Sequence, residues 1–169
     1  MTTTRRLLTL TTIAFAGLLL SACSDTTTET ERDESGEVTE RNDDASVFEI
    51  KVGDCYDLPD DSGSAETTEV QTITAVPCGD PHEAEAYHEV ELEDGDFPGD
   101  DAIQTETANA CGPAFDTFVG LAYEDSTLDI YQLFPTEDTW EQLDDRLISC
   151  LIYDPSNPEV TGTLAGAAR

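Results

Sequence analysis

The stretch from Cys78 to Glu91, CGDPHEAEAYHEVE, contains both histidines of the chain, four glutamates and one aspartate. Imidazole and carboxylate groups bind metals and carry out general acid–base catalysis. An HxxE pair such as His82 and Glu85 could chelate an ion on a helix, but Pro81 and the alternating pattern favour a strand. In a strand the even positions from His82 to Leu92 share one face and the glutamates share the other. We therefore predict that His82 packs structurally and that the glutamates are solvated.

The other sequence motifs for metal binding or catalysis are incomplete or absent. DGDFPGDD, from Asp94 to Asp101, places acids and Gly99 as in a calcium loop, but Pro98 and Thr105 stand where two ligands are needed. An acidic solvated turn is the favoured interpretation, with weak calcium capture as the alternative. The sequence has no GxSxG, SxxK or phosphate-binding loop. We expect no enzyme activity, no cofactor and no metal.

The elements that must position these residues follow from hydrophobic periodicity. We expect strands over 47–52, 70–76, 82–92, 127–134 and 146–153, the last apolar on both faces and central in the sheet. Apolar residues recur at helical spacing from Asp100 to Val119, where Pro113 should kink or divide the helix. A capped short helix is predicted over 136–143. This order indicates an α+β fold, a small mostly antiparallel sheet with one main helix packed on it.

Four cysteines lie in this region, and an exported chain would join them in two disulfides. Four cysteines permit three pairings. The sequential pairing joins Cys55 to Cys78 and Cys111 to Cys150, which ties neighbouring strand ends together and fastens the helix to the last strand. A zinc site is the rival interpretation, but no pair has CxxC spacing.

The amino terminus has the form of an export signal. Arg5 and Arg6 precede an apolar run of 14 residues, 7–20, which is too short to span a bilayer. LSAC, ending at Cys23, has the form of a bacterial lipobox. We predict a lipoprotein signal peptide over 1–22 and lipidation of Cys23, which places the protein at the outer face of the cytoplasmic membrane. An ordinary cleaved signal is the alternative.

The remaining composition is strongly acidic, with a formal net charge of −31. Such a charge excludes nucleic acid as a partner and leaves the lipid as the means of membrane attachment. It suits either an ordinary soluble surface or adaptation to high salt. Residues 23–46 are polar and charged, which predicts an acidic disordered tether about 25 Å long. We place the folded domain at 47–165.

Several short motifs occur in order between Val47 and Tyr153: VGDCYD, VPCGDPHEAEAY, CGPAFDTFVG and LFPTEDTWEQLDDRLISCLIY. Their succession resembles the septum formation domain family of actinobacterial envelope proteins, which includes lipoproteins. Family features matched here are a GDC turn, a cysteine followed by PHxxE, a helix cysteine, and a Trp followed by an acid, Arg and a cysteine strand. Leu143 and Asp144 stand where that family has a glycine.

The resemblance implies a place in the cell envelope, a link with division septa and the sequential disulfide pairing, but no reaction or ligand. We therefore predict a lipid-anchored, non-enzymatic interaction module for envelope or division proteins. The alternative is a cell-wall or metal-dependent hydrolase that uses His82 and Glu85. A candidate binding cleft combines His82, Glu85, Trp140 and Arg146. In a structural role, Trp140 would cover one sheet end and Arg146 would pair with Asp54 or Glu85.

Overall fold

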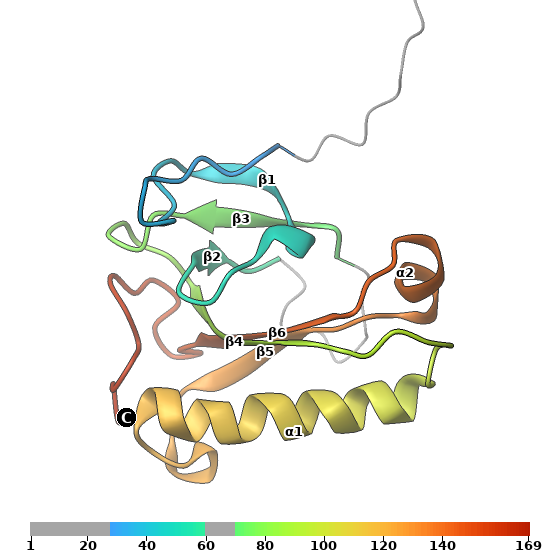
Figure 1. Ribbon diagram of the computed structural model, residues 1–169. Coiled ribbons are helices and arrows are strands. Elements are labelled where there is room, and N and C mark those ends of the chain that lie inside the picture. The colour runs from blue at the N-terminus through green and yellow to red at the C-terminus, as the bar shows by residue number, and fades with distance from the viewer. Residues whose placement is uncertain (1–27, 60–69) are drawn as a thin grey trace, which may run out of the picture.

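The computed structural model describes residues 28–59 and 70–169. In this part of the chain six strands form one antiparallel sheet in the order β1-β3-β2-β4-β6-β5. A long helix, α1 (Asp100–Val119), lies along one face of β4, β6 and β5 (Figure 1). The strands are β1 (Asn42–Ser46), β2 (Cys55–Asp57), β3 (Thr72–Val76), β4 (Ala84–Glu91), β5 (Asp129–Leu133) and β6 (Leu147–Tyr153). This confirms the predicted α+β class.

Helix α1 has the predicted bounds. It follows Gly99 and ends at Gly120, which caps it in the left-handed conformation with a φ of 79°. Pro113 lies inside it without dividing it, because a single proline removes one backbone N–H while the neighbouring turns stay packed on the sheet. The buried face of the helix consists of Ile103, Thr107, Cys111, Phe115 and Val119. The other helices are α2 (Glu137–Gln142) and two short 3-10 turns, η1 (Val47–Glu49) and η2 (Tyr123–Asp125).

Two apolar cores lie on opposite faces of the sheet. One fills the space between α1 and the sheet, and the other lies where β1, β3 and β2 curl over the opposite face (Figure 1). Strand β6 contributes to both, with Ile148 and Ile152 in the helix-side core and Leu151 in the other. It is an inner strand between β4 and β5, as its two apolar faces predicted.

Strand β4 contains a bulge that the sequence did not indicate. The pairing register with β6 shifts between Ala86 and His88. Before the bulge, Ala84 and Ala86 belong to the core under β1, whereas after it Val90 packs into the helix-side core. One extra residue exchanges the two faces of a strand. The prediction that all even positions from His82 to Leu92 share one face is therefore wrong.

The prediction of a first strand over 47–52 is also wrong. Val47–Glu49 form η1, and the Ser46 hydroxyl accepts a hydrogen bond from the Phe48 backbone N–H (3.3 Å), which starts this turn. Phe48 and Val52, predicted to face the core, are 42% and 54% exposed. The strand lies just upstream, in β1.

Residues 28–46 belong to the folded domain, which corrects this part of the disordered tether predicted over 23–46, whereas residues 23–27 lie outside the described residues. Strand β1 pairs with β3, and an isolated bridge joins Arg32 to Val38. Val38 and Ala45 reach the core, so this acidic segment does bury apolar surface. We call residues 28–41 the N-terminal strap. The domain also continues past 165, because the Ala168 N–H donates to Val119 in α1.

The predicted signal peptide and Cys23 lie outside the described residues. Within residues 28–59 and 70–169, no helix has both the length and the apolar character required to cross a membrane.

Candidate binding site

Both disulfides have the predicted sequential pairing. Cys55 is joined to Cys78 with the Cα atoms 5.2 Å apart, and Cys111 to Cys150 with the Cα atoms 5.6 Å apart. The first ties β2 to the turn before β4, and the second ties α1 to β6. These cysteines are therefore structural rather than zinc ligands.

His82 is completely buried. Its Nδ1 lies 2.9 Å from the Asp80 carbonyl oxygen, and its backbone exchanges two 2.9 Å hydrogen bonds with Val160. Its Nε2 is buried with no hydrogen-bond partner in the described part of the chain. A packed structural histidine was predicted, and this geometry agrees with it.

Glu85 is not solvated, contrary to the prediction for the glutamate row. It is 4% exposed, and its carboxylate accepts hydrogen bonds from the Thr163 hydroxyl (2.7 Å) and the Leu164 N–H (2.7 Å). The start of β4 is covered on both faces, so alternation there does not separate buried from exposed positions. Glu85 holds the C-terminal segment against the sheet.

Trp140 and Arg146 form a second cluster. The Trp140 indole is 5% exposed, and its Nε1–H donates to the Gly95 carbonyl oxygen at 2.9 Å. The Arg146 guanidinium carbon lies 3.8 Å from the ring centroid, and Nη1 donates to the Trp140 carbonyl oxygen at 3.0 Å. This is a cation–π contact that closes one end of the sheet.

Arg146 has different carboxylate partners from those predicted. It pairs with Asp144 (3.1 Å) and Asp94 (3.5 Å), not with Asp54 or Glu85. Asp144 takes a positive φ of 56° in the turn where a glycine was expected, a conformation that aspartate tolerates better than most residues. The turn therefore forms without the glycine.

The four residues of the candidate cleft do not converge. Glu85 lies at the start of β4 and pairs in register with Ile152, near the end of β6. Arg146 lies at the other end, just before β6, where its carbonyl oxygen accepts a hydrogen bond from the Leu92 N–H beyond the end of β4. Six residues of strand separate the two positions, about 20 Å. The predicted cleft of His82, Glu85, Trp140 and Arg146 is thus wrong, because the pairs occupy opposite ends of β4. No cluster of three or more potential metal ligands occurs in the part of the chain that the structure describes.

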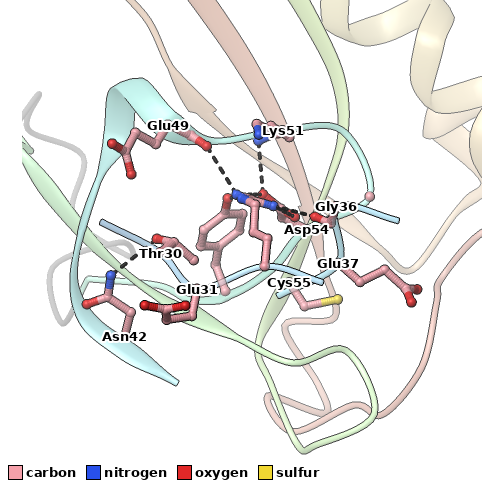
Figure 2. A network of polar contacts seen from close by, with 12 residues as sticks. Thr30, Glu31, Gly36, Glu37, Asn42, Glu49, Lys51, Asp54 and Cys55 are labelled. Carbon is pink, nitrogen blue, oxygen red and sulfur yellow. Dashed lines mark hydrogen bonds and ion pairs between the residues drawn. The ribbon is translucent and has the colours of Figure 1, made fainter. Parts of the chain in front are cut away.

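A third polar cluster, which the sequence did not indicate, surrounds Asp54 (Figure 2). The guanidinium of Arg32, in the strap, donates a 2.6 Å hydrogen bond to each carboxylate oxygen of Asp54. The Tyr56 hydroxyl donates to the same carboxylate at 2.8 Å. Arg32 also donates to the carbonyl oxygens of Gly36 (2.9 Å) and Glu49 (3.3 Å). The network therefore fastens the strap to the GDC turn.

The positive charge of Arg32 is paired with the negative charge of Asp54. The hydrogen bond from Arg32 to Asp54 raises the pKa of the Arg32 guanidinium, although partial burial opposes the shift. Burial, followed by the Asp54 charge, raises the pKa of the Tyr56 phenol well above its usual range. Both groups therefore keep their protons around Asp54 at physiological pH.

A pocket of about 320 Å³ opens beside this network. Its walls are three turns: residues 35–38 of the strap, residues 52–54 of the GDC turn, and residues 77–79 next to the Cys55–Cys78 disulfide. It contains none of the four residues of the predicted cleft. The sequence could not reveal it, because one wall comes from the segment interpreted as a tether.

The chain matches the septum formation family over residues 20–166. It belongs to this family. Neither a curated protein nor a solved structure matches the chain significantly. The septum formation match begins before residue 28, so the strap lies inside the family region. The family links the protein with cell division and the envelope.

Proposed function

We propose that this septum formation family protein is a lipid-anchored extracytoplasmic module that binds envelope or division proteins and catalyses no reaction. The observation that carries the proposal is the burial of His82 and Glu85, which are 0% and 4% exposed. Their polar groups contact Asp80, Thr163 and Leu164. A general acid or base must reach its substrate, whereas these side chains hold the fold together.

Two features support export and anchoring. The two disulfides suit an oxidising compartment outside the cytoplasm. The LSAC sequence ending at Cys23 supplies the thiol that would carry the lipid. Four residues lie between Cys23 and Thr28, the first described residue, so five Cα-to-Cα steps would keep the folded domain within about 18 Å of the anchor. The acidic domain would then be held close to the bilayer, without a long tether.

The anchor is tested by Cys23→Ala in the native host. The variant should lose metabolic lipid labelling and either enter the medium or remain unprocessed, while the wild-type chain stays in the membrane fraction. Retention of the lipid label by Cys23→Ala would refute the anchoring proposal.

The place of action is tested by immunolabelling the full chain in dividing cells. The proposal predicts enrichment at septa for the wild-type chain and loss of that enrichment for Cys23→Ala. A uniform distribution of the wild-type chain around the envelope, unchanged through division, would refute a septal role.

A further inference from the structure

We propose that the pocket beside the GDC turn binds a single basic side chain, lysine or arginine, presented by an extended segment of a protein partner. This inference rests on the proposed interaction function and names the site and chemistry of recognition. The volume of about 320 Å³ falls at the lower end of ligand-pocket sizes. It suits one long side chain better than a folded surface.

Part of the pocket wall is apolar. Val38, Val52 and Pro77 line the pocket, and Val52 is 54% exposed although it is aliphatic. Gly79 completes one side, and a Cβ built at this position meets no atom within 4 Å. Lysine and arginine have long methylene stems that pack along such surfaces while the charged head stays in water.

The acidic residues that line the pocket favour a positively charged ligand. Asp54 lines the pocket but is already paired with Arg32 through both oxygens. Glu37 also lines it and is exposed, and within residues 28–59 and 70–169 its carboxylate has a 3.5 Å contact to the Ser35 hydroxyl. With a formal net charge of −31 on the chain, an anionic ligand would be repelled and a basic one attracted.

The pocket is shared between two segments. Ser35 to Val38 belong to the strap, whereas the other two walls belong to the disulfide-linked turns. Arg32 joins them by its contacts to Asp54 and Gly36. The strap therefore contributes one wall of the binding pocket in addition to stabilising the domain.

The test is an NMR titration of the full exported chain, purified with both disulfides intact. The probe is a five-residue alanine peptide with one central lysine, and parallel titrations use central arginine, norleucine or glutamate. The lysine and arginine peptides should shift the amide signals of Gly36, Gly53 and Gly79 in a saturable way. The norleucine peptide should bind more weakly and the glutamate peptide should not bind.

Two variants test the pocket wall at Gly79 and the negative charge of Glu37. Gly79→Val fills open space at a position without a positive φ, so it should keep the fold and abolish the shifts. Glu37→Gln should weaken binding about two- to five-fold, as expected for an exposed ion pair. Glu124→Gln, an exposed acid in η2, is the matched charge control and should leave binding unchanged.

The inference fails if the shifts spread over the acidic surface, or if Glu124→Gln weakens binding as much as Glu37→Gln. It also fails if Gly79→Val binds like the wild-type chain. In each of these cases septal enrichment in cells could persist, so failure of the pocket is distinguishable from failure of the proposed function.

Discussion

At the scale of single residues, Glu85 shows how a carboxylate that suggests chemistry can serve the fold. It accepts from Thr163 and Leu164 while almost fully buried. A buried carboxylate is tolerated only when such donors satisfy it. Alternation predicted this side chain to be solvated, because the pattern carries no information about the C-terminal segment that covers it.

A double-mutant cycle tests this contact. Glu85→Gln replaces one accepting oxygen beside the buried Leu164 N–H by an NH2 group, and Thr163→Val removes a donor from the buried Glu85 carboxylate. Each should therefore lower the free energy of unfolding by about 1 to 3 kcal/mol. The double variant should lose less than the sum. Urea denaturation provides the measurement, with Thr105→Ala, on the exposed side of α1, as a control within about 0.5 kcal/mol. Additive losses would show that the two residues do not act together.

Glu89 predicts a pH dependence. Burial, followed by the Asp54 charge, raises its pKa above the ordinary 4.5, while Lys51 acts in the opposite direction. The folded protein therefore holds this proton more tightly than the unfolded chain, and stability falls as the pH rises through the folded pKa. Glu89→Gln should remove that fall, so its gain in melting temperature should be larger at about pH 7 than at about pH 4.

Thermal unfolding of Glu89→Gln and wild type at both pH values provides the comparison. Glu91→Gln is the control, because Glu91 is an exposed residue of the same strand. A gain for Glu89→Gln that is equal at the two pH values would contradict a raised pKa for Glu89 in the folded protein.

At the scale of elements, most of the secondary structure follows from the sequence. The bounds of α1 and the capped helix α2 follow from periodicity and from the Thr136 cap, and the number of cysteines together with the predicted export signal indicates two disulfides. The N-terminal strap and the β4 bulge do not follow. The strap depends on a contact between Arg32 and Asp54, 22 residues apart, and a bulge depends on how neighbouring strands fit.

The strap supplies a prediction with an internal control. Arg32→Ala leaves Asp54, whose side chain is 6% exposed, without its cation and should cost about 2 to 4 kcal/mol. Arg41→Ala removes an exposed arginine that pairs with Asp43 and Asp57 and should cost less than about 1 kcal/mol. Urea unfolding of the two variants should separate these values. Equal losses would mean that the strap contributes no more than a surface ion pair.

The candidate site was the least predictable part at this scale. Sequence motifs indicated His82, Glu85, Trp140 and Arg146, but all four contribute to packing at two ends of β4. The pocket instead joins three turns that are far apart in sequence. The sequence indicates only that the GDC turn and the Cys78 turn lie close together, because the predicted Cys55–Cys78 disulfide joins them.

The molecule as a whole is strongly acidic. The formal net charge of −31 at pH 7 causes self-repulsion in the compact state. Added salt shortens the screening distance from about 10 Å at 0.1 M to about 3 Å at 1 M. The melting temperature should therefore rise steadily between low and molar sodium chloride, as measured by circular dichroism. A flat or falling melting temperature would favour an ordinary soluble surface over salt adaptation.

If the protein acts by binding, Glu85 has a structural role only. Glu85→Gln and Thr163→Val disrupt the same contact, but only the first removes a carboxylate that could act as an acid or base. The most direct measurement is therefore septum formation in cells that depend on each variant, compared at equal amounts of folded protein. A binding function predicts equal septation for the two variants. Loss of septation with Glu85→Gln alone, at unchanged folded amount, would contradict it.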